Sequence, residues 1–224
     1  MSVLASSTSK ELIDEGDSLF QKGNYTEAFS VYDQLLKANY YSPQMLLKMA
    51  YVKEALGDYT NTLYYLNLYY MYSADNRALT KMEELASAYD LKGYKLNDGE
   101  RFLSFYYKSF KEINIGAIIV FLVILGFLIK NKIRKHNYLL PAFSLLILMG
   151  FFFFLNNFAV NGNKGIVSND ETFLMDAPSA GARVVEKIKK GHRLKVIDEK
   201  DIWYKVAWDE EEAFVRKHNM KIVH

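Results

Sequence analysis

The residues of this chain that could act in acid–base or metal chemistry are few and scattered over its 224 positions. Histidine can serve as a general base or a zinc ligand, and the four histidines are His136, His192, His218 and His224. No two of them have the i, i+4 spacing that puts two metal ligands on one helix face. The chain contains no cysteine, which excludes a thiolate ligand, a thiol nucleophile and a disulfide. We expect solvated surface histidines and no metal site.

Other residues that could take part in catalysis or bind an ion also lack the surroundings that such a role needs. Four consecutive acidic residues, 209–212, could bind a cation, but they lie between two expected strands, which favours a solvated hairpin turn. The glycines fall at expected turns and strand ends rather than in a phosphate-binding loop. No serine is surrounded by a nucleophile-elbow motif. The sequence therefore predicts a non-enzymatic protein that uses no cofactor.

The composition argues against a charge-driven partner. The 28 Lys and Arg residues nearly balance the 26 Asp and Glu residues, which leaves a formal charge of +2. A protein that binds a polyanion usually carries a larger positive excess, so we expect no nucleic-acid partner. Half of the residues are hydrophobic, which excludes a disordered chain.

Two long apolar runs predict transmembrane helices. Residues 113–129 and 138–155 contain 17 and 18 residues without a charge. As a helix the first run would be about 26 Å long, close to the thickness of the hydrocarbon layer. A buried helical hairpin in a soluble core is the alternative, but neither run has the polar stripe of a surface helix.

The short segment between the runs, residues 130–137, predicts the topology. Its basic residues are Lys130, Lys132, Arg134 and Lys135, and it has no acidic residue, so the positive-inside rule places it in the cytoplasm. Both flanking segments, 1–112 and 160–224, then lie in the periplasm, and the chain spans the bacterial inner membrane twice. The alternative is that both are cytoplasmic. Residues 1–8 are similar to the end of a cleaved signal peptide, so we expect the native start to lie upstream.

The N-terminal segment repeats itself at an offset of 34 residues. The sequence Gly-Asn-Tyr-Thr at 23–26 recurs as Gly-Asp-Tyr-Thr at 57–60, and Leu12 aligns with Leu46. This pattern resembles the tetratricopeptide (TPR) repeat, which is a pair of helices. We assign residues 9–111 to three repeats, 9–42, 43–76 and a divergent 79–111 whose turn is Gly93-Tyr94. A generic helical bundle is the alternative.

The TPR resemblance implies a concave surface, made by the first helix of each repeat, that binds extended peptides. The expected groove residues are Lys10, Ile13, Asp17, Phe20, Gln21, Gln44, Leu47, Tyr51 and Glu54. They lack the Lys and Asn pairs with which chaperone-binding members hold a C-terminal carboxylate. A tyrosine-rich run, 64–72, lies on the second helix of repeat two. We expect half of it in the core and the rest at a partner surface or the membrane interface.

The last segment, 164–224, changes from helical spacing to alternation and predicts a small antiparallel barrel. Its order of Ala177-Pro178, Lys190-Gly191 and Ala213-Phe214-Val215 resembles the bacterial SH3 domain, although the family usually has Gly-Trp-Val at the last site. Some members bind cell-wall peptide and others mediate protein contacts. The candidate surface aromatics are Trp203, Tyr204, Trp208 and Phe214.

The order of these segments along the chain predicts a multidomain membrane protein with an all-α TPR array, two transmembrane helices and a small all-β SH3-like barrel. That order resembles the BatE-like family of Bacteroides aerotolerance (Bat) operon proteins. The resemblance implies partners among von Willebrand-type Bat proteins and a MoxR-type ATPase, in envelope stress or oxygen tolerance. We expect a membrane-anchored scaffold that binds partner proteins. The alternative is a cell-wall anchor or sensor whose barrel binds peptidoglycan.

Overall fold

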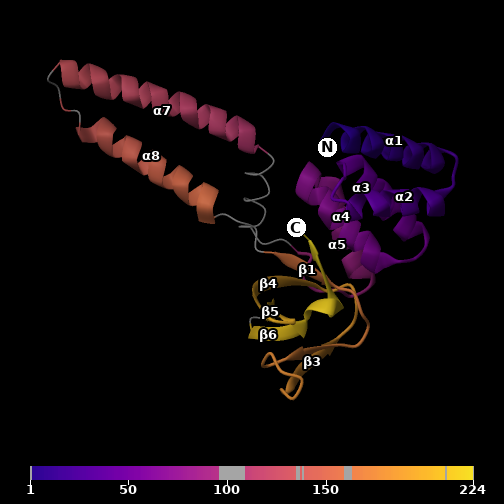
Figure 1. The fold of residues 1–224 in the computed structure, drawn as a ribbon. Coiled ribbons are helices and arrows are strands. Elements are labelled where there is room, and N and C mark those ends of the chain that lie inside the picture. Colours follow the sequence, from indigo (N-terminus) through magenta and orange to yellow (C-terminus); the bar gives the residue numbers. More distant parts are fainter. Residues whose placement is uncertain are drawn as a thin grey trace. The chain divides into compact units, whose positions relative to one another are not determined.

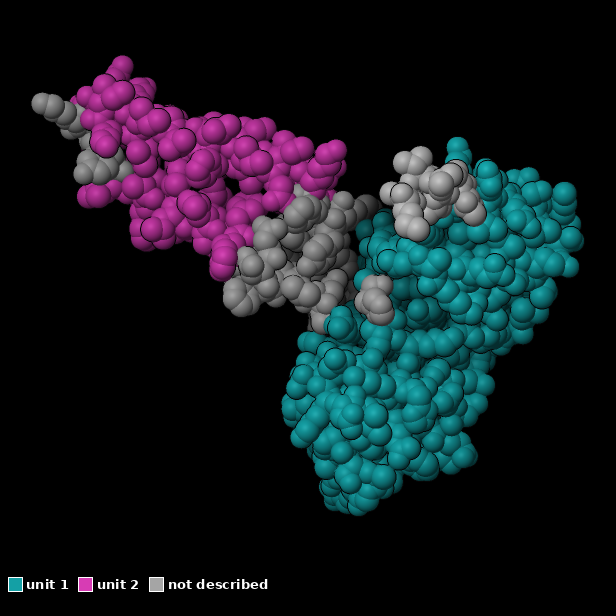
Figure 2. Space-filling view, in the orientation of Figure 1, with its two compact units in different colours: residues 1–95, 162–224 teal, residues 96–161 magenta. Residues whose placement is uncertain are grey.

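The computed structural model describes residues 2–95, 109–134, 137, 139–158, 163–209 and 211–223. The chain forms two compact units, residues 1–95 with 162–224 (teal in Figure 2) and residues 96–161 (magenta). The chain therefore leaves the first unit after residue 95 and returns to it at residue 162. The first unit combines helices with a sheet, and the second contains two apolar helices (Figure 1).

The first unit opens with five described helices, which we call the helical array (Figure 1). They are α1 (Ser2–Gln21), α2 (Tyr25–Lys37), α3 (Pro43–Ala55), α4 (Tyr59–Ser73) and α5 (Asn76–Ala88). The second helix of each of the first two pairs starts at Tyr25 or Tyr59, which matches the 34-residue offset of the sequence. The predicted helical region is thus confirmed.

Glycines support the helical repeat in two ways, by allowing close packing of helices and by forming the turns between them. Gly16 lies against Tyr32, and a Cβ at position 16 would approach the Tyr32 ring to 2.6 Å, so α1 and α2 pack closely only because that side chain is missing. Gly23 and Gly57 have φ angles of +82° and +70° and form the turns between helices. Such a left-handed conformation at the end of a helix favours glycine.

The sheet contains seven antiparallel strands in the order β3-β2-β6-β5-β4-β1-β7, which we call the β-domain, residues 163–223. The strands are β1 (Lys164–Val167), β2 (Thr172–Met175), β3 (Val184–Ile188), β4 (Arg193–Lys200), β5 (Trp203–Trp208), β6 (Glu211–Arg216) and β7 (Met220–Val223). A short 3-10 helix, η1 (Lys217–Asn219), precedes β7. The predicted all-β segment is confirmed.

The helical array and the β-domain share a hydrophobic core. Ile166 of β1 and Val223 of β7 are buried in the same cluster as the interior residues of the array, and helix α4 packs against both strands. This explains why α4 is apolar on more than one face, since it is covered by helices and by the sheet. Of the tyrosine-rich run, Tyr65, Leu66 and Leu68 are buried.

Polar contacts reinforce this junction, which we call the seam. The Arg193 guanidinium is buried and donates from Nε to the Gly93 carbonyl at 2.7 Å and from Nη1 to Asn67 Oδ1 at 2.8 Å. The same guanidinium lies 4.7 Å from the ring centre of Tyr94. The Tyr94 hydroxyl donates to the Gly191 carbonyl at 2.7 Å. Residues 92–94, just before the gap in the described chain, are therefore held against residues 191–193 at the start of β4.

The seam contains part of the expected third repeat. Gly93-Tyr94, predicted to form the turn of that repeat, follows α5 outside any described helix, and Tyr94 is buried against the β-domain. The second helix predicted for the repeat, residues 98–111, lies almost entirely outside the described residues. The first helix is present as α5, with Met82 and Ala86 in the core.

The second unit contains α7 (Phe110–Ile133) and α8 (Leu139–Phe158), which contact each other. Within the described residues, the stretch Lys111–Ile133 is long and apolar enough to cross a membrane by length and composition, and the apolar stretch Leu139–Phe153 is shorter. Only one of the two predicted spans is thus supported by this criterion. Helix α7 also includes Lys130 and Lys132, which were predicted to lie in the loop. Lys135 lies outside the described residues.

The close approach at Gly93 generates a stability prediction. A Cβ on Gly93 would lie 1.9 Å from the Arg193 carbonyl oxygen, and Gly93 has a φ of +92°. Gly57 shares the positive φ, but a Cβ there meets nothing within 4 Å. We expect Gly93→Ala to lower the free energy of unfolding by about 1–3 kcal/mol more than Gly57→Ala, because only the former adds a clash to the backbone strain. Chemical denaturation of the full chain in detergent measures both values. Equal losses would contradict the described seam.

Candidate functional site

An open groove lies on the helical array between α3, α4 and α5. Its volume is about 390 Å³. Its lining residues are Leu47, Ala50, Tyr51, Glu54, Leu66, Tyr69, Asp75, Arg77, Ala78 and Lys81. The aliphatic side chains among them come from all three helices, whereas the charged ones come from α3 and the start of α5. The groove therefore combines an apolar lining with charged residues, which suits a ligand with an apolar side chain.

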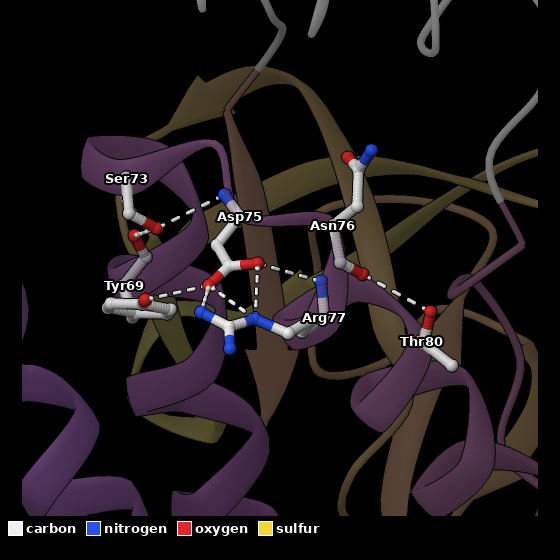
Figure 3. A network of polar contacts seen from close by, with 6 residues as sticks. All are labelled: Tyr69, Ser73, Asp75, Asn76, Arg77 and Thr80. Carbon is white, nitrogen blue, oxygen red and sulfur yellow. Dashed lines mark hydrogen bonds and ion pairs between the residues drawn. The ribbon is translucent and has the colours of Figure 1, made fainter.

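The junction of α4 and α5 fixes one end of this groove (Figure 3). Asp75 caps α5 by accepting from the Arg77 backbone N–H at 3.0 Å, and its carboxylate also accepts from the Arg77 guanidinium at 2.8 Å. The Tyr69 hydroxyl donates to the same carboxylate at 3.0 Å. These hydrogen bonds, with that from Arg77 first, hold the pKa of the Asp75 carboxyl well below its usual range. Asp75 therefore stays ionised and keeps Tyr69 and Arg77 in place.

The other charges in the groove are also paired with each other. Lys81 Nζ lies 2.6 Å from Glu54 Oε1, so this ion pair joins α5 to α3. The hydrogen bond to Glu54 raises the pKa of Lys81. Each carboxylate that lines the groove thus has a cation beside it. A strongly charged ligand would have to compete with these pairs, so the groove favours a neutral, apolar one.

The structure brings together some of the predicted groove residues. Leu47, Tyr51 and Glu54 line the groove, and all three are exposed. Phe20 lies beside it, because its ring contacts the Tyr51 ring edge-on at 5.8 Å. Tyr25, which was not predicted, completes an aromatic cluster with these two rings, at 5.1 Å from Phe20 and 5.7 Å from Tyr51.

The remaining predicted residues do not line the groove. Asp17 is used inside the array, since it accepts from the Tyr32 hydroxyl at 2.6 Å and pairs with Lys48 at 2.7 Å. Burial of the Tyr32 phenol, followed by its bond to Asp17, raises the pKa of Tyr32. The others lie on α1 or at the start of α3, outside the groove lining: Lys10, Ile13, Gln21 and Gln44.

Sequence reasoning missed the contribution of α4 and α5. Leu66 and Tyr69 come from α4, whose tyrosine-rich run was expected to lie half in the core and half at a partner surface or the membrane interface, without being assigned to the groove. Ala78 and Lys81 come from α5. The spacing of Met82 and Ala86 had indicated α5, so its contribution to the groove could have been predicted from the sequence. The contribution of α4 could not have been predicted, because periodicity does not show which part of a buried helix stays exposed.

The predicted surface aromatics of the β-domain divide into two groups. Trp203 and Trp208 are buried, and the Trp208 indole N–H donates to a Glu186 carboxylate oxygen. Tyr204 and Phe214 are half-buried. Both tryptophans are thus buried, but they lie five positions apart on β5, so alternation places them on opposite faces of the strand. Trp208 packs in the core of the β-domain, to which Trp203 does not belong.

The histidines also differ from the expectation of a solvated surface. His218 is exposed, and His136 and His224 lie outside the described residues. His192, by contrast, is buried at the seam, where its Nδ1 accepts the Lys92 backbone N–H at 2.9 Å. The prediction for His192 is wrong because a contact between residues 100 positions apart leaves no local pattern. No group of three metal-ligating side chains gathers in the part of the chain that the structure describes.

The environment of His192 generates a pH prediction. Burial, followed by the charges of Lys189 and Lys92, lowers the pKa of His192, while Glu186 and Asp90 oppose this shift. The unfolded imidazole, with a pKa of about 6.5, then takes up a proton before the folded one. Stability contributed at neutral pH is therefore lost as the pH falls below about 6.5.

We expect His192→Asn to reduce the loss in melting temperature between about pH 7.5 and pH 5, because asparagine can accept the Lys92 N–H but does not titrate. His218→Asn, at an exposed position, serves as the control and should keep the full loss. Thermal unfolding of the full chain followed by circular dichroism measures both. An unchanged pH dependence in His192→Asn would show that another group is responsible.

Comparisons with known proteins identify one part of the chain. Residues 173–221 match the family model of the bacterial SH3 domain. Searches of the curated proteins and of the solved structures found no match. The matched segment runs from β2 to β7 and thus covers most of the β-domain. Bacterial SH3 domains generally bind proteins or peptidoglycan.

Proposed function

We propose that the chain is a membrane-anchored, non-enzymatic scaffold that binds partner proteins through its helical array and its β-domain. The array acts as a set of TPR repeats and holds an extended, apolar segment of a partner in the groove between α3, α4 and α5. The β-domain supplies a second contact. The single observation that carries the proposal is the open groove, whose apolar lining comes from three helices and whose carboxylates are already paired.

The aromatic cluster beside the groove supports a protein ligand. Tyr51 is about half exposed, at 51%, and its ring is held edge-on by Phe20 and Tyr25. Aromatic rings that are fixed before binding lose little conformational entropy, and they are enriched among the residues that dominate protein interfaces. Tyr51 is thus suited to be the main contact of the groove.

The second unit supports the membrane anchor. Ile118, Leu122 and Phe127 of α7 each expose more than half of their surface. An apolar surface of this kind is unstable in water and stable in lipid. We propose that α7 and α8 both span the bacterial inner membrane, with the basic residues between them in the cytoplasm and both ends of the chain in the periplasm.

The resemblance to BatE-like proteins extends the proposal to a biological setting. In that setting the scaffold belongs to an envelope-stress or aerotolerance complex, with von Willebrand-type Bat proteins and a MoxR-type ATPase as partners. The order of modules supports this assignment, and the bacterial SH3 match supports its last part.

A charge placed in the groove tests the scaffold. Leu47 and Leu56 are both exposed leucines of the α3 region, but only Leu47 lines the groove. We expect Leu47→Glu to lower recovery of a crosslinked partner from membranes by about tenfold, because a buried carboxylate without a cation opposes binding. Leu56→Glu is the matched control and should leave recovery unchanged. Equal recovery with both variants, or no reproducible partner with the native chain, would count against the proposal.

The bacterial SH3 match favours a second candidate, a cell-wall anchor that binds peptidoglycan. The full chain is the right material for this test, because the β-domain shares its core with the helical array. The scaffold proposal predicts that the detergent-solubilised chain stays in the supernatant when purified peptidoglycan is sedimented. Saturable co-sedimentation would favour the cell-wall anchor instead.

A further inference from the structure

A second hollow, of about 370 Å³, lies in the β-domain and belongs neither to the groove nor to the seam. Strands β2 and β3 contribute Phe173, Met175 and Val184, which form an apolar wall. Strands β5 and β6 contribute Trp203 and Arg216. The hollow therefore has an apolar side and a cationic side.

The cation of this hollow, Arg216, is held in place, and no carboxylate of the described residues forms an ion pair with it. Arg216 lies directly opposite Trp203 in the register of β5 and β6, and its guanidinium lies 5.4 Å from the Trp203 ring centre. Stacking on an aromatic face orients a guanidinium while leaving its N–H edge free to bind a carboxylate. The nearby Lys217, by contrast, is paired with Glu199 at 3.2 Å. No carboxylate is found among the described residues that line the hollow.

The guanidinium and the apolar wall together indicate which kind of ligand the hollow could bind. A single guanidinium fork matches one carboxylate, to which it can donate two parallel hydrogen bonds. The apolar wall of Phe173, Met175 and Val184 suits a small apolar side chain next to that carboxylate. The two groups occur together at the C-terminus of a peptide that ends in a small apolar residue.

We propose that this hollow binds the C-terminal carboxylate of a partner protein, with Arg216 as the binding residue. The inference rests on the proposed binding role of the β-domain, but it does not depend on the groove of the helical array. Failure of the Leu47 test would therefore leave it standing, and its own failure would leave the groove untouched.

The test uses a small probe and the full chain in detergent. N-acetyl-alanyl-alanine and its C-terminal amide are titrated by ligand-observed NMR. We expect the acid to bind at least about tenfold more tightly than the amide, since a hydrogen-bonded charge contributes an effect of this size. Equal binding of acid and amide, or no binding of the acid up to about 10 mM, would overturn the proposal. This arm needs no variant, so it holds even if a substitution disturbs folding.

Variants assign the effect to one residue. Arg216→Gln should weaken binding of the acid by about tenfold and leave binding of the amide unchanged, whereas Arg216→Lys should fall between the two. Lys195→Gln removes the same charge from an exposed position of β4 outside the hollow and should change neither. Unchanged acid binding by a folded Arg216→Gln variant would overturn the assignment. The probe is used in its L,L and D,D forms. A clear preference for the D,D form would overturn the proposal of a protein partner and would indicate a cell-wall peptide.

Discussion

The structure of the first unit depends on one buried charge. Arg193 belongs to the β-domain, yet the acceptors of its guanidinium, the Gly93 carbonyl and Asn67 Oδ1, belong to the segment 1–95. The Asn67 amide is itself oriented, because its Nδ2 donates to the Leu63 carbonyl at 2.8 Å within α4. Removing one of these acceptors while the seam stays closed would leave a buried cation partly unsatisfied, a change that typically destabilises a protein by about 1–3 kcal/mol. The helical array and the β-domain are therefore one folding unit rather than two modules on a linker.

This has a consequence for function. A scaffold whose binding sites sit on separate, flexibly joined domains gains only the effective concentration that its linker allows. Here the groove between α3, α4 and α5 and the hollow beside Arg216 belong to a single compact unit with a shared core. Their spacing is fixed by the seam, so a partner that engages both is selected by geometry as well as by chemistry. The membrane attachment that we propose belongs to the other unit, which contains helices α7 and α8.

Much of this fold could be predicted from the sequence because it is local. The 34-residue offset located the turns at Gly23 and Gly57, and alternation located β5, since both patterns follow from the geometry of a single element. The seam could not be predicted in this way, because Arg193 and Asn67 are 126 positions apart and no periodicity connects them. One hint was present. Asn67 interrupts an apolar run in a helix, where a buried amide needs a partner.

The shared core and the seam imply that the helical array and the β-domain unfold together, and native-state hydrogen exchange of the full chain measures this directly. We expect the slowest-exchanging amides of α4 and of β4 to open with the same free energy, because both lie at the seam and report one cooperative event. A β4 that exchanges at a clearly lower opening free energy while α4 stays protected would contradict it. In that case the β-domain would open on its own, and the spacing of the two proposed binding sites would not be fixed.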